Sequence, residues 1–146
     1  SASGPTSWQI MDVEDICHDI HGNWKYEGIP QHYDRYNHAD NLLHSEFGCD
    51  GLSSIEGLMR ILPKEDLFPT DMNRNLVWRH HGEWWDCYAR DTDLFGELTN
   101  LNRWVMLSQF IQAEAVRYIL ESNRRRKFRN SGSIIWQLNE PWPNVS

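Results

Sequence analysis

A single carboxylate, Glu46, is the first candidate for chemistry in this sequence. The stretch 41–48 reads Asn-Leu-Leu-His-Ser-Glu-Phe-Gly. Its apolar start favours a short buried strand, and the glycine that follows the carboxylate lets the backbone turn sharply. Enzymes often present catalytic carboxylates at the ends of buried parallel strands. The plainer interpretation is a solvated glutamate that follows a core strand, so the rest of the chain has to decide between the two.

Two further predicted strands end in clusters of polar and aromatic residues. Residues 16–21 alternate apolar and polar side chains up to Gly22, and residues 133–138 are apolar up to a polar exit. The two clusters consist of Asp19, His21 and Trp24, and of Asn139, Glu140 and Trp142. Strands separated by helices pair in parallel, which places their carboxyl ends together. We therefore expect both clusters to meet Glu46 at one mouth, as on the active face of a (β/α) barrel.

Helical periodicity fills the segments between these strands. Apolar residues recur at steps of three and four from Thr99 or Asn100 over about 24 residues, which predicts a long helix packed on a sheet or barrel. Shorter helices are predicted from a Ser53 or Ser54 cap to Ile61, from Asn73 to His80, and over 83–90. The segments predicted as loops are 1–15, 25–40 with one helical turn near 33–38, 64–70, and 91–97.

Composition argues against some classes of partner. The formal net charge is −7 and charged residues make up 24% of the chain, which disfavours nucleic acid or an anionic membrane as the main partner. The basic run 124–127 is interpreted as a solvated helix end. No apolar stretch is long enough for a transmembrane helix, and the first residues lack a signal-peptide pattern. Eight Trp residues favour a core plus a binding surface for flat ligands such as sugars.

The cysteines and the remaining histidines are given structural interpretations. Three cysteines with no CxxC spacing predict neither a disulfide framework nor a zinc site, although one bridge is left open. No metal site is expected at His80 and His81, because no carboxylate or cysteine lies at metal-site spacing. The other interpretations are small buried fillers for Cys17 and Cys49, satisfied barrel-interior residues for His18 and His44, and either a rim or a packed helix for Glu83-Trp84-Trp85.

Several motifs, in this order and spacing, resemble glycoside hydrolase family 2 in its β-mannosidase and exo-β-glucosaminidase branch. Ser45-Glu46-Phe47-Gly48 resembles the nucleophile motif of that branch, and Asp19-Ile20-His21 resembles the Asp-Val-His of its sixth barrel strand. Residues 132–143 resemble its last strand, Gly then Trp-Gln-Leu-Asn-Asp then Trp, with Glu140 in place of the usual Asp. Arg79-His80-His81 and the helix around 109–112 also fall at the expected places.

This resemblance implies a fold and a set of missing parts. The family's catalytic domain is a (β/α)8 TIM barrel preceded by β-sandwich domains, and residues 1–146 resemble only its C-terminal portion, roughly strands 6 to 8 with their helices. The general acid/base of the family follows the fourth strand, in an Asn-Glu pair, and is expected outside this chain. The remainder of the barrel and the β-sandwich domains are the implied partners. No metal or organic cofactor is implied, and the family suggests an extracytoplasmic location.

The resemblance also implies roles for individual residues. A retaining glycosidase needs two carboxyl groups about 5–5.5 Å apart. Glu46 is implied as the nucleophile, and it must be ionised, so we expect hydrogen-bond donors beside it. The implied substrate is a β-mannoside or related β-glycoside that is cleaved from its end. The residues expected to bind the carbohydrate are His21, Trp136 and Asn139 around the cleaved sugar, Trp24 and Trp142 as stacking surfaces, and Glu140 on a sugar hydroxyl.

Three alternatives stay open at this point. Asn139-Glu140-Pro141 also fits the Asn-Glu acid/base signature of the wider clan, although Glu140 follows Glu46 in sequence where the clan has the reverse order. A chain without its acid/base could be a carbohydrate-binding protein with no turnover. It could also be an inactive fragment, whose exposed strand edge would then need a cover.

Overall fold

The computed structural model describes residues 19–82, 86–137 and 141–146, which form two compact units. Unit 1 contains the chain up to Cys49 together with Gln112–Leu138, and unit 2 contains Asp50–Ile111 and Asn139–Ser146. The longest helix, α5 (Leu101–Arg125), contributes its first half to unit 2 and its second half to unit 1. Each unit is described by itself below.

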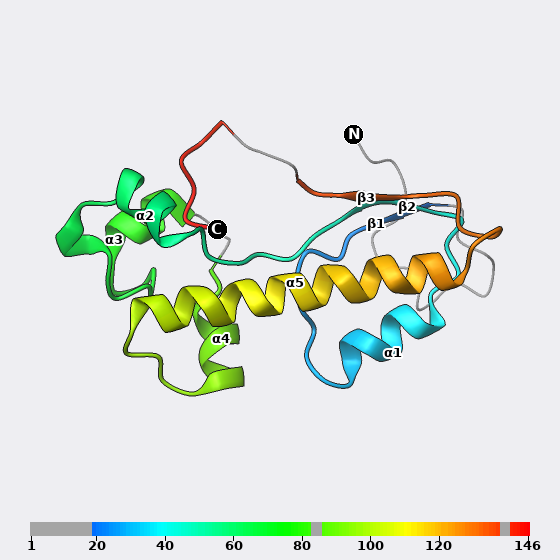
Figure 1. Ribbon diagram of the computed structural model, residues 1–146, viewed down its shortest axis with the longest axis horizontal. Helices are drawn as coiled ribbons and strands as arrows, with labels where there is room; N and C mark the ends of the chain where they lie inside the picture. The colour runs from blue at the N-terminus through cyan, green and yellow to red at the C-terminus, as the bar shows by residue number, and fades with distance from the viewer. Residues whose placement is uncertain (1–18, 83–85, 138–140) are drawn as a thin grey trace. The chain divides into compact units, whose positions relative to one another are not determined.

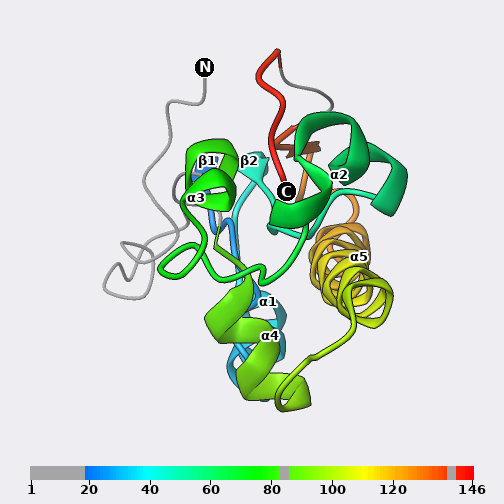
Figure 2. The same ribbon diagram turned by 90° about the vertical axis from the view of Figure 1, so that its left-hand side faces the viewer.

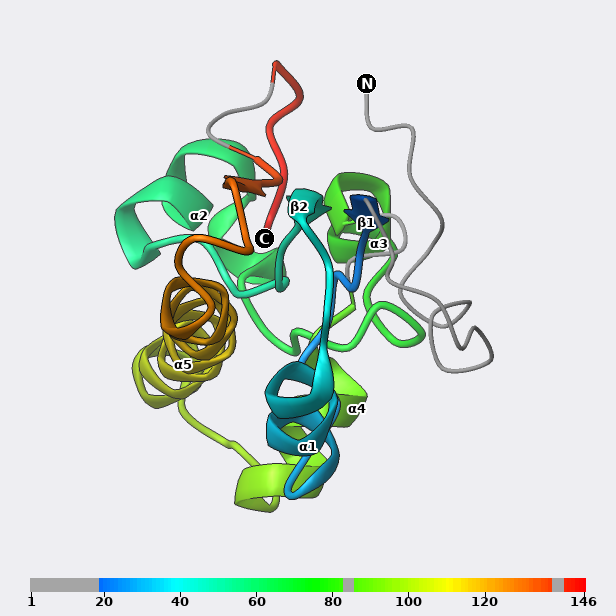
Figure 3. The same cartoon turned by 90° about the vertical axis from the view of Figure 1, so that its right-hand side faces the viewer.

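Unit 1 is a parallel sheet covered by helices on one side. The sheet has the order β1 (Asp19–His21), β2 (Leu43–Phe47), β3 (Ser133–Ile135), and both pairings are parallel. Helix α1 (Gln31–His38) and the second half of α5 lie on the same side of this sheet (Figures 1 and 3). Tyr36, Phe47 and Ile119 pack together between them as a buried core. The predicted α/β class with parallel strands is therefore confirmed.

Unit 2 consists of short helices around a larger apolar core. Its elements are α2 (Ile55–Ile61), the 3-10 turn η2 (Lys64–Asp66), α3 (Leu76–Gly82), α4 (Tyr88–Phe95) and the first half of α5 (Figure 2). The core centres on Leu58, Trp78 and Trp104, each at most 1% exposed. The Ser54 side chain accepts a hydrogen bond from the Gly57 amide and caps α2, as the sequence predicts. Asn100 likewise accepts from the Arg103 amide at the start of α5.

Several predicted elements have the wrong bounds, and the strand predicted over 133–138 ends at Ile135. Helix α1 has eight residues rather than one turn. Helix α3 starts at Leu76 rather than Asn73, because the Asp71 carboxylate accepts from the Asn73 amide and holds a turn there. The predicted turn at 91–97 is instead occupied by α4, which runs to Phe95 and ends at Gly96 with a positive φ of 76°.

The basic segment at the end of α5 is only partly a solvated helix end. Arg124 and Lys127 are exposed, but Arg126 is half-buried. Its guanidinium donates to the carbonyl of Ala39 and to the side chain of Asn41, just before β2. Sequence periodicity could not single out this residue, because its partners are about 85 positions away. Arg126 therefore ties the helix end to the entry of the central strand.

Two further findings concern the cysteines and the length and polarity of the helices. Cys49 and Cys87 are both buried, in agreement with the interpretation of Cys49 as a small filler. Within the described ranges, every helix is too short or too polar to cross a lipid bilayer.

Candidate functional site

Glu46 lies one residue before the end of β2, next to a β-bulge. His44 pairs with Ile20 of β1 but Glu46 pairs with His21, so Ser45 is an extra residue on β2. The pairing with β3 shifts in the same interval. Simple alternation would place Glu46 on the face of His44, whereas the bulge puts the buried pair His44 and Phe47 on the helix-covered face. The bulge thus directs the Glu46 carboxylate away from the helix layer.

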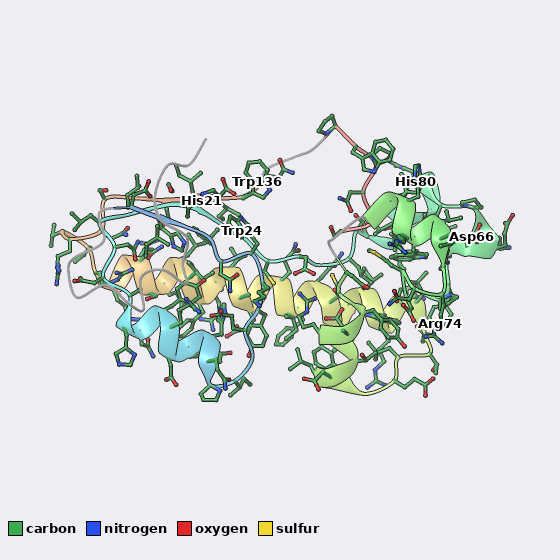
Figure 4. The ribbon with its side chains drawn as sticks, turned by 180° about the vertical axis from the view of Figure 1, so that it is seen from behind. His21, Trp24, Asp66, Arg74, His80 and Trp136 are labelled. Carbon is green, nitrogen blue, oxygen red and sulfur yellow. The ribbon has the colours of Figure 1, made fainter. Side chains whose placement is uncertain are left out.

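Two side chains at the exit of β1 contact one oxygen of this carboxylate. The Trp24 Nε1–H group donates to Glu46 Oε1 over 3.0 Å, and His21 Nε2 lies 3.0 Å from the same atom. The His21 and Trp24 rings meet edge to face with centroids 5.0 Å apart (Figure 4). The Glu46 side chain is 14% exposed. Among the described residues, both contacts go to Oε1, so Oε2 is the oxygen that they leave open.

Backbone hydrogen bonds beyond the strands hold this arrangement together. The Gly22 amide donates to the Glu46 carbonyl over 2.6 Å, and the Gly48 amide donates to the Asn23 carbonyl over 3.0 Å. Gly22 has a φ of +99°, which favours glycine, and the Trp24 ring lies against the space that a side chain at 22 would occupy. The turn after β1 therefore depends on Gly22, and His21 and Trp24, the two residues that contact Glu46 Oε1, flank it.

Trp136 follows β3 and meets β2 through its backbone. Its amide donates to the Phe47 carbonyl over 2.7 Å, and its side chain is 46% exposed. A pocket of about 330 Å³ lies beside it in unit 1. The lining residues are Cys49, Gln112, Ala113, Val116, Ile135, Trp136 and Gln137. Trp136 is thus joined to the end of β2 through its main chain, whereas the predicted convergence of Asn139, Glu140 and Trp142 on Glu46 stays a prediction.

Gly48 is needed for a close approach rather than for the turn that the sequence predicts. It is absent from the glycines with positive φ, but a Cβ atom at this position would overlap the Trp136 carbonyl oxygen. Gly48→Ala is therefore expected to destabilise the protein by about 1–3 kcal/mol, because backbone has to move to make room. Urea unfolding measures this loss.

Gly57→Ala is the matched control for that substitution. A Cβ atom at Gly57 would lie no closer than 3.4 Å to the Ser54 hydroxyl, and the residue is inside α2. This variant is expected to keep or gain stability, by about 0.5–1 kcal/mol, because alanine is the better helix former. Equal unfolding midpoints for the two variants would contradict the close-approach explanation.

Trp142 belongs to unit 2 and has its own aromatic surroundings. Its ring lies 5.9 Å from the His81 ring at an interplanar angle of 27°, and 5.4 Å from the His80 ring. His81 Nδ1 is 2.8 Å from the Pro143 carbonyl, which fixes the histidine against this segment. The structure therefore groups Trp142 with His80 and His81 in one aromatic cluster.

Several predicted residues lie outside the described ranges. They are Asn139 and Glu140 of the predicted carbohydrate site, Cys17 and His18 of the first strand, and Glu83-Trp84-Trp85. In the described part of the chain, no group of three or more His, Cys, Asp or Glu side chains is arranged to hold a metal ion. Among the described residues, no hydrogen bond joins the Glu46 carboxylate to a second carboxyl group.

Behind the sheet, His44 is buried and hydrogen-bonded, but on the helix-covered face rather than in a barrel interior. Its Nε2 is 2.6 Å from the Gly22 carbonyl, and its Nδ1 is 3.2 Å from the Asn123 amide nitrogen on α5. Sequence reasoning identified a satisfied histidine but missed these partners, because the bulge after His44 puts it on the opposite face from Glu46. The only sequence signal is a polar residue within an apolar strand.

Burial lowers the pKa of His44 to about 4, an effect that its bond to Gly22 and the charge of Asp19 oppose and that Arg126 reinforces. Burial also lowers the pKa of His32, whose Nε2 is 3.2 Å from the Ala115 carbonyl. Since the unfolded chain binds protons near pH 6.5 and the folded one does not, stability is expected to fall as pH drops from about 6.5 towards 4. His44 accounts for about 3 kcal/mol of this loss.

Urea unfolding at several pH values measures this dependence. The difference between the wild type and His44→Gln isolates the His44 contribution, because glutamine cannot titrate. His38→Gln is the control, since His38 is exposed at the end of α1. Parallel pH curves for the wild type and His44→Gln would contradict the assignment.

Comparison with known proteins finds similar solved structures. No protein-family model matches the chain, and no curated protein matches it either. Among solved structures, it is similar to a β-D-mannosidase from Dictyoglomus thermophilum, with a TM-score of 0.71 and 27% sequence identity. The match covers 89% of this chain but only 16% of the mannosidase chain. This likeness suggests a relationship to glycoside hydrolases, over a small part of such a protein.

Proposed function

We propose that this chain carries the nucleophile half of a retaining glycosidase site, in a protein that hydrolyses β-mannosides or related β-glycosides. The observation that carries the proposal is the Glu46 carboxylate, held by Trp24 and His21 through one oxygen at the carboxyl end of a parallel strand. The likeness to a β-mannosidase supports the same chemistry. The motifs around Glu46 and after β3 support assignment to glycoside hydrolase family 2.

In the proposed reaction, Glu46 Oε2 attacks the anomeric carbon of the sugar. The bond from that carbon to the leaving oxygen breaks, and a general acid protonates the oxygen. Water then hydrolyses the glycosyl ester on Glu46, and the same acid, now a base, takes the proton of the water. The hydrogen bond from Trp24 and the close contact with His21 Nε2 hold Oε1, which keeps the carboxylate oriented for attack through Oε2.

The proposal divides the remaining roles among the other candidate residues. Trp136 and Asn139 are proposed to line the position of the cleaved sugar, and Glu140 to bind a sugar hydroxyl. Trp142, exposed on unit 2, is proposed as a separate stacking surface for a sugar ring. A Trp142→Ala variant with unchanged KM and carbohydrate affinity would contradict that role.

We further propose that the fold is part of a (β/α)8 barrel, about strands 6 to 8, completed by further chain. The edge strand β3 supports this, because Ile134 is 56% and Ile135 is 44% exposed, and apolar edge strands are normally covered. The general acid/base is then expected outside this chain. In the complete gene product, alanine in place of the acid/base carboxylate outside this chain should lower turnover. Added azide should then restore turnover and give a glycosyl azide of retained configuration. The same rescue in Glu140→Ala would instead assign the acid/base to Glu140.

Trapping of the covalent intermediate tests the proposed function directly. A 2-deoxy-2-fluoro-β-mannosyl fluoride should inactivate the complete gene product and add one fluorosugar to the peptide that contains Glu46, as read by mass spectrometry. Activated β-mannosides should be turned over with retention of configuration. A fluorosugar on another residue would overturn the nucleophile assignment. Carbohydrate binding with neither turnover nor trapping would instead favour a binding protein.

A further inference from the structure

We propose that His44, which lies behind the sheet, is a positioning residue of the glycosidase site. In this role it holds the Gly22 carbonyl, so that the turn after β1 places the Trp24 indole N–H and the His21 ring against Glu46. The inference rests on the proposed function for its catalytic consequence, but its structural content stands on hydrogen bonds alone. His44 is 1% exposed and is separated from the Glu46 carboxylate by the bulge in β2. It therefore acts through the backbone rather than on a substrate.

The hydrogen-bond partners of His44 specify one tautomer. The Gly22 carbonyl can only accept, so Nε2, 2.6 Å away, must carry the proton. Nδ1 faces the side-chain amide nitrogen of Asn123 at 3.2 Å, and that nitrogen can only donate. Both contacts are satisfied together only by a neutral imidazole protonated on Nε2.

A further contact orients the Asn123 amide. Arg126 Nη2 donates to Asn123 Oδ1 over 2.6 Å, so the oxygen of the amide faces Arg126 and its nitrogen faces away. That nitrogen also donates to the Ser133 hydroxyl of β3 over 2.8 Å. A hydrogen-bonded chain with one direction of donation thus runs from Arg126 through Asn123 and His44 to Gly22.

The hydrogen-bonded chain ends at Gly22, and the positions of His21 and Trp24 beside Glu46 depend on this residue. The Gly22 amide is bound to the Glu46 carbonyl, and the Gly22 carbonyl is bound to His44. His21 precedes Gly22, and the Trp24 ring packs over it. Fixing both sides of Gly22 therefore fixes the direction in which His21 and Trp24 leave β1. Loss of the His44 contact would free the Gly22 carbonyl to rotate and would move the Trp24 and His21 side chains away from Glu46.

The test measures the environment of Trp24 and the activity separately, in the complete gene product. The protein is labelled with 5-fluorotryptophan, and the Trp24 signal in the ¹⁹F spectrum is assigned by its absence in Trp24→Phe. His44→Leu should shift the Trp24 signal and lower kcat by about 10- to 100-fold with little change in KM, because the nucleophile loses its orientation. His44→Gln, whose amide can donate to Gly22, should restore most of both. The control His38→Gln should change neither.

The outcomes separate this inference from the proposed function. A shifted Trp24 signal in a protein without glycosidase activity would support the positioning role and overturn the function. An active His44→Leu variant with unchanged kcat and Trp24 signal would overturn the inference and leave the function intact. If His44→Leu does not fold, ¹⁵N spectra of the wild type still decide. A neutral His44 protonated on Nε2 supports the inference, and a proton on Nδ1 overturns it.

Discussion

Replacing Glu46 by glutamine is expected to lower kcat on an activated β-mannoside by about 10⁴-fold, the largest effect of any single change in this chain. Glutamine has the same shape, and its amide oxygen can still accept the hydrogen bond that the carboxylate receives from Trp24 over 3.0 Å and can still lie against His21. The fold should therefore survive. The amide is a poor nucleophile, so the glycosyl ester cannot form and the first step stops.

Glu121→Gln is the matched control for that variant. Glu121 lies on α5, is 49% exposed and pairs with Arg117 at the surface, where ion pairs contribute little. It should keep full activity. Azide added to Glu46→Gly should restore turnover and give a glycosyl azide of inverted configuration, because azide attacks from the face that Glu46 leaves. A Glu46→Gln variant within tenfold of wild-type activity, with no contaminating hydrolase, would show that Glu46 is not the nucleophile.

The sequence predicted the general arrangement of the site because parallel pairing is a strong constraint. Strands separated by helices place His21, Trp24 and Glu46 at one edge, and the structure joins these three side chains by direct contacts. The long helix was predicted almost to the residue, because its apolar periodicity extends over about seven turns. Both predictions rest on patterns that repeat along the chain.

The features that orient the Glu46 carboxylate could not be predicted from the sequence. Leu42 and Leu43 were expected to be the buried residues of the central strand, but they are half-buried while His44 and Phe47 are buried. The extra residue Ser45 shifts the alternation after His44, so that Phe47 rather than Glu46 shares the buried face of His44, and a bulge has no signature in a single strand without its partners. Gly48 likewise looked like a turn residue, because sequence does not reveal that the Trp136 carbonyl lies against it.

The structure also shows a contact of Trp24 that the sequence did not predict. It was expected as a stacking surface for a sugar ring, and that role stays a prediction. The structure adds that its indole N–H donates to Glu46. A Trp can do both, because the polar edge and the flat faces of the indole are separate surfaces. The position and type of this residue in the sequence do not reveal that the N–H edge of its ring contacts a side chain 22 residues away.

In unit 2, Asp91→Ala is expected to destabilise the fold by about 3–5 kcal/mol, because it removes one partner of a buried ion pair. Asp91 is 0% exposed, and its Oδ1 lies 2.7 Å from Arg90 Nη2. Its Oδ2 accepts from the Trp104 indole over 3.1 Å. Arg90, 14% exposed, also contacts Asp50 and Ser108. Removal of the carboxylate leaves a buried guanidinium with less compensation and an indole N–H without its acceptor.

Urea unfolding at neutral pH measures this loss, with Asp93→Ala as the control. Asp93 is exposed on the same helix, two residues away, and should change stability by less than about 0.5 kcal/mol. The double variant Arg90→Met with Asp91→Leu should lose less than the sum of the single variants, because apolar groups replace both charges together. Strict additivity would mean that the two charges are not coupled. A loss below about 1 kcal/mol in Asp91→Ala would mean that water reaches Arg90 and stabilises it in place of the carboxylate.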